Sequence, residues 1–375
     1  MLSSTSSSDP TNANTSGVGG RWVVREIPEQ PWLILFALAM AAVTVAVAGW
    51  EVHVRQLGYG PTLDDTPNLW ATQRARAAAV GSDQVVFVGA SRTLFDMDLR
   101  AFQQEVGGPP PIQLATVGSN PLVILEDLAR DPTYAGTTIV GVVPALVAAA
   151  AGPPVSAPTK FVAHYHQWSV ANRMELPLAL WLDEHFAFIN QDDLTLSRLI
   201  DDALDLPLRA KVYAPQLPGY MYTLDRSRQA RMIERIATDS AVQEKIQQIW
   251  LPLFRGPPKP GVFTDKQWEG MLSDGWEANL RRIKESVFRI TARGGKVIFS
   301  RLPSTGGVRE LEDRVSSRAA IWDRILAETG APGIYFEDYS ELKGFNCPEW
   351  SHLNVRDATE YTRRFARILK AKGLP

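Results

Sequence analysis

The sequence is poor in cysteine, in net charge and in long basic runs, and each shortage excludes a class of protein. A single cysteine, Cys347, excludes an intrachain disulfide and a zinc site built from several cysteines. A formal net charge of -2 without a long basic run leaves no electrostatic footprint for nucleic acid, so no such partner is expected. Cys347 lies two residues before Glu349, yet a small apolar filler explains it better than a catalytic thiol.

Charged residues are also missing from one stretch near the N-terminus, between Trp32 and Trp50. Its length approaches the roughly 20 apolar residues that a spanning helix needs, and a tryptophan stands at each end as an interfacial anchor. A buried core helix is the alternative, but such a helix rarely lacks every charge. We therefore expect a transmembrane helix over residues 31–50 that contacts the bilayer through residues 32–50.

The flanking residues bear on the orientation and the fate of this helix. Arg21 and Arg25 precede it and only Arg55 follows closely, which favours a cytoplasmic N-terminus. Ala46-Val47-Ala48 also fits a signal-peptidase site, but the region before the apolar run is long for a signal peptide. The expectation is a retained, single-pass signal anchor in the bacterial inner membrane, with the rest of the chain in the periplasm or outside the cell.

After the anchor, short apolar runs alternate with segments of helical periodicity. This alternation predicts a parallel sheet with helices on both faces. The expected strands are Gln84–Val88, Ile112–Ala115, Thr137–Val143, Lys296–Ser300 and Ile334–Phe336. The expected helices are Asp96–Val106, a segment that Ser119 or Asn120 caps and that ends at Arg130, Leu311–Thr329 and Val355–Lys370.

The pattern changes between residues 150 and 293, where proline-rich joints frame segments of helical spacing. Those segments are Leu194–Leu204, Ser227–Trp250 and Lys266–Thr291. His164 and His166 suggest a metal-ligand pair, but no carboxylate or cysteine follows at a typical spacing, so neither a metal nor another cofactor is expected. An aromatic-rich lid over an acyl chain or a polysaccharide and the plain core of a helical subdomain both stay open. The predicted divisions are a disordered cytoplasmic tail (1–30), the transmembrane anchor (31–50), a first part of an α/β domain (51–149), a helical insertion or lid (150–293) and a second part of the α/β domain (294–375).

Polar residues of catalytic type follow the first and the last predicted strands. Ser91 follows the first strand in Gly89-Ala90-Ser91, and Glu349 stands three residues before His352. Because ligand sites of parallel sheets form at the carboxyl ends of the strands, these residues are expected at one edge. They predict a triad in which Ser91 is the nucleophile, His352 the base and Glu349 the orienter. The structural alternatives are a helix N-cap for Ser91 and a hydrogen-bonded cap of the last helix for His352, and Glu337 or Asp338 are alternative orienters.

This arrangement resembles the SGNH (GDSL-like) hydrolase superfamily over roughly residues 80–145 and 294–372. Gly89-Ala90-Ser91 looks like its nucleophile block, Gly118 like its oxyanion glycine, and Glu349-Trp350-Ser351-His352 like its Asp-x-x-His block. The resemblance implies a three-layer α/β/α, flavodoxin-like sheet that carries the largely helical insertion. Ala90 and Glu349 replace two aspartates of the family pattern, and Val143-Pro144-Ala145 stands where a Gly-x-Asn-Asp block is usual.

The resemblance extends to binding residues. It implies that the backbone N–H groups of Ser91 and Gly118 hold the oxyanion, with Asn120 as a further donor. Arg92 directly follows the nucleophile and Arg301 follows the fourth strand, so both are candidates for binding an anionic group of the substrate. A salt bridge of Arg92 with Asp96 or Asp98, and a structural ion pair for Arg301, are the alternatives.

Within the superfamily, the N-terminal anchor resembles the envelope-facing branch, which includes the alginate O-acetylation proteins and the D-alanyl transfer protein of teichoic acid synthesis. It implies a membrane-anchored serine O-acyltransferase or esterase that acts on a cell-envelope polysaccharide or lipid-linked glycan through an acyl-Ser91 intermediate. The implied partners are an acyl donor, the glycan and a membrane-bound O-acyltransferase. A catalytically degenerate SGNH-like scaffold, or a polymer-binding subunit of an acylation complex, is the alternative that Ala90 and the missing Asn block favour. A periplasmic binding module is a third reading, which only the insertion supports.

Overall fold

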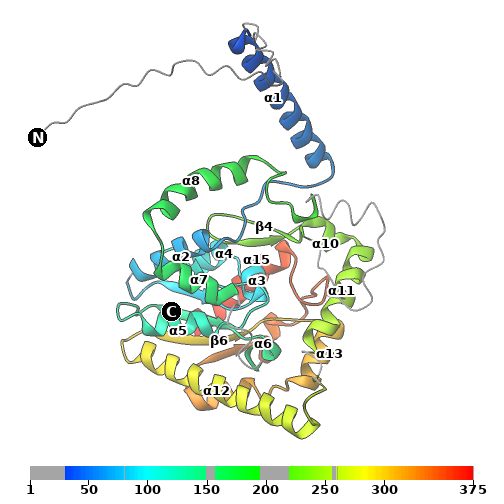
Figure 1. Cartoon of the computed structure of the whole chain (residues 1–375). Helices are drawn as coiled ribbons and strands as arrows, with labels where there is room; N and C mark the ends of the chain where they lie inside the picture. Colours follow the sequence, from blue (N-terminus) through cyan, green and yellow to red (C-terminus); the bar gives the residue numbers. More distant parts are fainter. Residues whose placement is uncertain are drawn as a thin grey trace, which may run out of the picture. The chain divides into compact units, whose positions relative to one another are not determined.

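Apolar and mostly β-branched runs form the five strands of a parallel sheet in the computed structural model (Figure 1). The structure describes residues 30–79, 81–148, 157–194, 219–255, 259 and 261–374. The strands are hydrogen-bonded in the order β2-β1-β3-β6-β7. They are β1 (Val85–Val88), β2 (Ile112–Gln113), β3 (Thr137–Gly141), β6 (Lys296–Arg301) and β7 (Gly333–Tyr335). The α/β class and the parallel sheet expected from the sequence are therefore confirmed.

The strand order fixes where a site can form. Every residue of β1 and of β3 is buried, as expected for strands covered on both faces. From β1 the chain crosses to β2 on one side and then returns to β3 on the other side. The crevice of such a sheet opens where the connections diverge, at the carboxyl ends of β1 and β3. Ser91 follows the end of β1 by three residues, so the predicted nucleophile lies at this edge of the sheet.

Two groups of helices accompany the sheet. In the first group, α12 (Asp265–Thr291) packs against α5 (Leu122–Arg130) and α14 (Trp322–Thr329). In the second, α15 (Val355–Ala371) packs against α3 (Ser91–Asp96) and α4 (Leu99–Val106). Figure 1 shows α12 and α15 on opposite sides of β6. Further α-helices in the described part of the chain are α2 (Pro67–Ala79), α6 (Pro144–Ala148), α7 (Ala157–His166), α8 (Val170–His185), α10 (Glu234–Thr238), α11 (Ser240–Phe254) and α13 (Gly306–Val315).

Two predicted helices are broken in the structure. The segment Asp96–Val106 is divided into α3 and α4, because Asp98 leaves the helical conformation and caps α4 by accepting from the N–H groups of Arg100 and Ala101. The segment Leu311–Thr329 is likewise divided between α13 and α14. The last helix was predicted within one residue of its observed end.

The predicted helix at Ser227–Trp250 is wrong over its first third. A hairpin of β4 (Tyr222–Leu224) and β5 (Ala230–Met232) occupies that part of the chain. Arg228 in its turn has a left-handed φ of +59°, and its buried guanidinium binds Asp65 at 2.7 Å and the carbonyl groups of Gln113 and Ala115. This long-range anchoring stabilises the turn, and helical spacing within the segment gives no sign of it.

The helix α12 was assigned to the insertion, but it belongs with the sheet. Its apolar residues Trp276, Leu280, Ile283, Val287 and Ile290 join the main hydrophobic core, and it packs against β6. It thus serves as a crossover helix between β3 and β6. Residues 195–204 of the predicted helix Leu194–Leu204 lie outside the described residues.

The helix α1 (Trp32–Gln56) covers the predicted anchor, and among the described residues it alone is long and apolar enough to cross a membrane. This supports a single membrane anchor. The chain divides into two units, Met1–Gly49 and Trp50–Pro375, and both hydrophobic cores lie in the second. The predicted cytoplasmic tail, up to residue 29, lies outside the described residues.

Candidate active site

Glu349 and His352 form a buried hydrogen-bonded pair in the loop before α15. One carboxylate oxygen of Glu349, Oε1, lies 2.7 Å from Nδ1 of His352 and also accepts from the backbone N–H of His352 at 2.7 Å. Trp350 between them has a left-handed φ of +74°, which closes the loop tightly enough for both contacts. Because the carboxylate requires a donor, we assign the proton to Nδ1, and Nε2 is then an acceptor.

Trp250 of α11 completes the surroundings of this carboxylate. Its indole N–H donates to Oε2 of Glu349, which also accepts from the backbone N–H of Ser351 at 3.3 Å. The same indole ring meets the imidazole of His352 edge-on, with centroids 5.7 Å apart. The region between β3 and β6 therefore supplies part of the site. Sequence reasoning missed Trp250, because a tryptophan in a helical segment carries no signal of a distant carboxylate.

Ser91 is the first residue of α3 and is half-buried. Ala90 is the N-cap, so Ser91 does not have the capping role that was its structural alternative. Phe95, one helical turn after Ser91, stacks on the imidazole of His352 with centroids 4.5 Å apart. The structure thus brings His352 against the helix that Ser91 begins.

Ser91 and His352, the predicted nucleophile and base, are not hydrogen-bonded to each other in this structure. Among the described residues, Nε2 of His352 has no hydrogen-bond partner although it is shielded from solvent. The Ser91 hydroxyl is therefore not hydrogen-bonded to it. Catalytic hydrogen bonds are often long in unliganded enzymes and tighten only when substrate binds.

The packing of Thr93 explains why residue 89 is a glycine. A Cβ atom at Gly89, or at Gly141 at the end of β3, would overlap the Thr93 hydroxyl. Glycine at both strand ends therefore lets the first turn of α3 lie directly on the sheet. This close packing positions Ser91 at the edge, where the sequence predicted it.

The expected oxyanion donors differ in how the structure uses them. Ser91 opens α3, so its backbone N–H has no acceptor within the helix. Gly118 is exposed with φ +61°, and its loop is joined to Gly89 by a bond from the Thr116 N–H to the Gly89 carbonyl at 3.1 Å. Asn120 instead accepts from the Leu122 N–H and donates to the Val147 carbonyl. The Asn120 side chain therefore already has two partners beside the start of α5, whose N-cap is Pro121 and not Ser119 or Asn120 as the sequence suggested.

Arg92 and Arg301, predicted to bind substrate, are both buried and share one carboxylate. Nη1 of Arg92 lies 2.8 Å from Oε1 of Glu312, and Nη2 of Arg301 lies 2.5 Å from Oε2. Burial acts to raise the pKa of Glu312, but the charges of Arg301 and Arg92 outweigh it and the pKa is lowered. The ion pair proposed for Arg301 is present, whereas the partner of Arg92 is Glu312 rather than Asp96 or Asp98. Substrate binding by either guanidinium is corrected to a structural role.

Asp96 is fully buried near His352. Its Oδ1 accepts from the backbone N–H of Leu353 at 2.9 Å, while Oδ2 has no hydrogen-bond partner among the described residues. Burial raises the pKa of Asp96 to about 7. Cys347 is also fully buried, and burial raises the pKa of its thiol well above the ordinary value, which fits a packing role.

The remaining titratable residues singled out in the sequence have structural partners. Glu337 is paired with Arg309, and Asp338 is paired with Arg318. Nδ1 of His352 is bonded to Glu349 and to neither of these alternative orienters. His164 bonds Asn68 and His166 bonds Asp127 at 2.6 Å, which fastens α7 to α2 and α5. Within the described ranges no group of histidine, cysteine and carboxylate residues is arranged to hold a metal ion.

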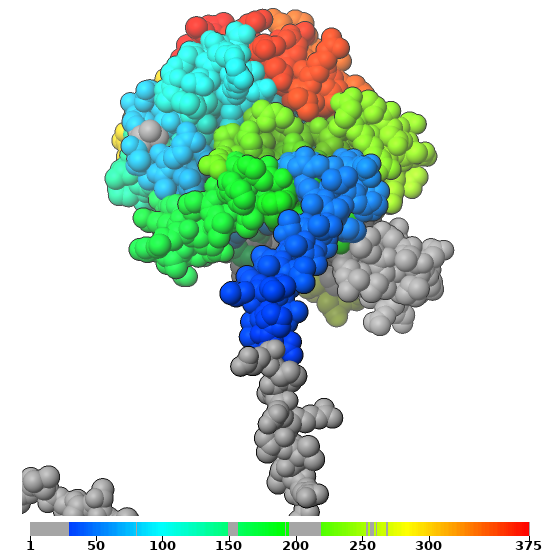
Figure 2. Space-filling view, turned by 90° about the horizontal axis from the view of Figure 1, so that it is seen from above, coloured from blue at the N-terminus to red at the C-terminus, as the bar shows by residue number. Residues whose placement is uncertain are grey.

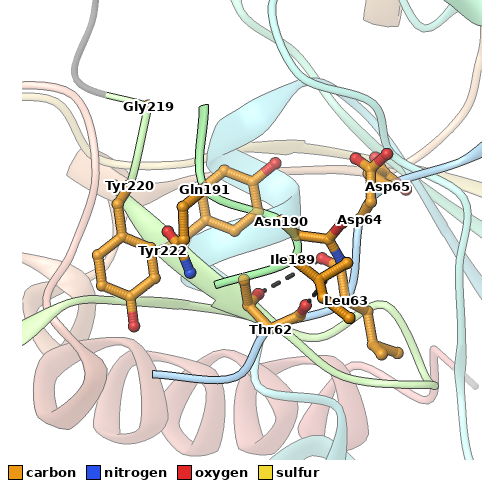
Figure 3. A pocket seen from close by; sticks show the side chains of 10 residues that line it. All are labelled: Thr62, Leu63, Asp64, Asp65, Ile189, Asn190, Gln191, Gly219, Tyr220 and Tyr222. Carbon is orange, nitrogen blue, oxygen red and sulfur yellow. Dashed lines mark hydrogen bonds between the residues drawn. The ribbon is translucent and has the colours of Figure 1, made fainter. Parts of the chain in front are cut away.

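A polar pocket of about 210 Å³ lies beyond Phe95 (Figure 3). Tyr220 and Tyr222 form part of its wall, and Tyr222 touches Phe95 with ring centroids 4.8 Å apart. Gln191 also lines the pocket, and its Oε1 is buried with no partner among the described residues. Two ring contacts, Tyr222 with Phe95 and Phe95 with His352, therefore connect the wall of the pocket to the predicted base.

No protein-family model, curated protein or solved structure matches this chain. The interpretation of the site therefore rests on its own geometry.

Proposed function

We propose that this chain is a membrane-anchored serine O-acyltransferase or esterase with an SGNH-like three-layer fold. One observation carries the proposal. Glu349 holds Nδ1 of a buried His352 whose Nε2 has no partner among the described residues, and this imidazole stacks on the helix that begins at Ser91. A histidine oriented by a carboxylate beside a serine is the arrangement that activates a hydroxyl nucleophile.

The chemistry follows from these positions. Oγ of Ser91 attacks the carbonyl carbon of an acyl donor while Nε2 of His352 takes its proton. The negative charge that develops on the carbonyl oxygen is stabilised by the backbone N–H groups of Ser91 and Gly118. The protonated imidazole then gives its proton to the leaving oxygen, which yields acyl-Ser91. A sugar hydroxyl or water attacks this ester in the second half, and His352 again moves the proton.

The acceptor is proposed to be a sugar of a cell-envelope polysaccharide or a lipid-linked glycan. The pocket beyond Phe95 supports a glycan, because it combines two tyrosine rings with the unpartnered carbonyl oxygen of Gln191, which requires a donor such as a hydroxyl group. Asp64 and Asp65 also line it, and the Asp65 carboxylate is already paired with the Arg228 guanidinium. We place the folded unit in the periplasm or outside the cell, where such glycans occur.

The test is covalent labelling of the full chain, in detergent, with a fluorophosphonate probe followed by intact mass. We expect one label on the wild type, none on Ser91→Ala and a reduced rate for His352→Ala. Ser119→Ala is the matched control, because Ser119 follows β2 at the same sheet edge but its hydroxyl donates to the Thr116 carbonyl. Labelling of Ser91→Ala at the wild-type rate would contradict the proposal.

A catalytically inactive scaffold is the second candidate, and specific observations favour it. The Ser91 hydroxyl and Nε2 of His352 are not hydrogen-bonded, and the Asn120 side chain is already bonded to the Leu122 N–H and the Val147 carbonyl. A scaffold predicts that folded wild-type protein takes up neither the probe nor an acetyl group from p-nitrophenyl acetate. The same result in the presence of membranes containing an O-acyltransferase would establish it over the enzyme.

A further inference from the structure

Helix α8 (Val170–His185) presents an apolar stripe to solvent. Four large side chains recur at the i, i+4, i+8 and i+11 positions of one face, and no residue of the helix is buried. They are Val170 (71% exposed), Met174 (75%), Leu178 (64%) and Trp181 (48%). Single exposed apolar residues are ordinary, but a continuous stripe along about three turns marks a surface that contacts something apolar.

The other side of α8 already has its partner, because Leu180 packs against the second hydrophobic core. A capping box of Ser169 and Asn172 fixes the start of the helix. In Figure 1 the helix runs along the outside of the folded unit, and in Figure 2 the green surface that includes it faces the viewer uncovered. The stripe is therefore a surface of a well-defined helix.

The C-terminal end of α8 is held by the residues that follow the apolar run of the anchor. The Glu51 carboxylate accepts from the N–H groups of Ala187 at 2.9 Å and Phe188 at 3.4 Å, and Nη2 of Arg55 donates to the His185 carbonyl at 3.1 Å. Glu51 directly follows Trp50, where the apolar run ends. The end of α8 is thus fixed to the segment that emerges from the bilayer if α1 spans it.

We propose that α8 is an interfacial helix that lies on the same bilayer, with its stripe among the lipid headgroups and upper acyl chains. This rests on α1 being a membrane span. Trp181 stands at the end nearest Glu51, and tryptophan is the residue most typical of the membrane interface. The helix carries one arginine, Arg173, against three carboxylates, so insertion of apolar surface and not attraction to anionic lipid holds it there.

A membrane-bound α8 would also orient the pocket. Ile189, Asn190 and Gln191 line the pocket and directly follow the segment that Glu51 holds. The pocket would then open close to the bilayer surface. A lipid-linked glycan, whose sugars stay near the membrane, would reach it more readily than a distant polymer.

The test uses the full chain in phosphatidylcholine nanodiscs with a fluorescent NBD label at Met174→Cys or Leu178→Cys. Cys347 is fully buried, and any background labelling of its thiol is measured on the wild type. Phe288→Cys is the matched control, because Phe288 of α12 is equally exposed and apolar. We expect blue-shifted emission at residues 174 and 178, quenching there by lipids with a doxyl group high in the acyl chain, and neither effect at residue 288.

Each other outcome overturns the proposal in a distinguishable way. If chains that remain in the nanodisc emit at residues 174 and 178 as they do at residue 288, the apolar stripe of α8 is exposed to water and does not contact lipid. A blue shift without doxyl quenching would show that protein, a partner or a second copy, covers the stripe. A blue shift that appears only when phosphatidylglycerol is added would replace apolar insertion by charge attraction. Chains that leave the nanodisc would remove the membrane span on which the proposal rests.

Discussion

Glu312 and Glu349 are buried to almost the same degree, 1% and 0% exposed, yet their surroundings differ in kind. Glu312 lies between the guanidinium groups of Arg92 and Arg301, which outnumber its charge. Within the described part of the chain, Glu349 has no arginine or lysine partner and accepts N–H groups from Trp250, from the backbone and from the His352 ring. A buried charge is tolerated in both ways, but only the second involves a ring nitrogen, Nε2 of His352, that can accept a proton.

The difference shows how to separate a structural carboxylate from a functional one. In the Glu312 cluster one carboxylate offsets part of the charge of two guanidinium groups, and the cluster joins Arg92 after β1 and Arg301 at the end of β6 to α13. In the Glu349 cluster the charge orients a neutral ring that can take up a proton. The charges of Arg301 and Arg92 lower the pKa of Glu312, so this shifted pKa indicates an ion pair and not a catalytic group.

Glu349→Gln tests the functional half of this comparison and has the largest expected effect. A glutamine amide can donate to Nδ1 of His352, which would move the ring proton to Nε2 and remove the base. The rate of probe labelling at Ser91 should fall on the order of 10⁴-fold, as it does when the orienting carboxylate of a Ser-His-Asp triad becomes an amide. The measurement is the pseudo-first-order labelling rate of the full chain.

Glu337→Gln is the control for this prediction, because Glu337 was an alternative orienter in the sequence and binds Arg309 instead. Its labelling rate should equal that of the wild type. An unchanged rate for Glu349→Gln together with a loss for Glu337→Gln would reverse the assignment.

Glu312→Ala tests the structural half, and stability is its readout. The variant leaves two buried guanidinium groups, Arg92 and Arg301, without their anion. Breaking a buried pair in this way costs about 3–5 kcal/mol of the free energy of unfolding. Urea unfolding of the full chain in detergent measures it. Glu277→Ala removes an exposed partner of Arg324 and should cost less than about 1 kcal/mol; equal losses for both variants would contradict the comparison.

The sheet and its edge could be predicted from the sequence because both depend on local patterns. Short apolar runs located all five strands, with bounds that differ by one or two residues. The rule that parallel strands end at one edge brought Glu349 and His352 into the same region as Ser91. What failed was the segment at Ser227, since the hairpin there depends on the contact of Arg228 with Asp65, far away in the chain.

The partners of the site residues could not be predicted, because each is a non-local choice. Arg92 and Arg301 do lie at the expected edge, but a sequence does not reveal that Glu312 of α13 folds between them. Trp250 reaches Glu349 from α11, and nothing near either residue signals that pairing. Position along the chain thus predicted the sheet edge at which the candidate residues lie, whereas burial and partners determine which of their side chains are free to react.

Asp96 extends the comparison to a third buried carboxylate, with the smallest expected effect per pH unit. Among the described residues it has neither two guanidinium partners nor a full set of N–H donors, only the N–H of Leu353. Burial raises its pKa from 3.8 to about 7, so the folded protein keeps a proton between about pH 4 and 7 that the unfolded chain releases. The free energy of unfolding should therefore fall as pH rises through this window, by about 1.4 kcal/mol per pH unit, and level off above it.

Asp96→Asn keeps an oxygen for Leu353 but has no titrating proton, so its pH dependence should be flatter by that slope. Urea unfolding at pH 5, 6, 7 and 8 measures the difference, with the exposed Asp338→Asn as control. Parallel curves for Asp96→Asn and the wild type would show that Asp96 is charged throughout the window, and that one N–H together with its charged neighbours is enough to hold a buried carboxylate.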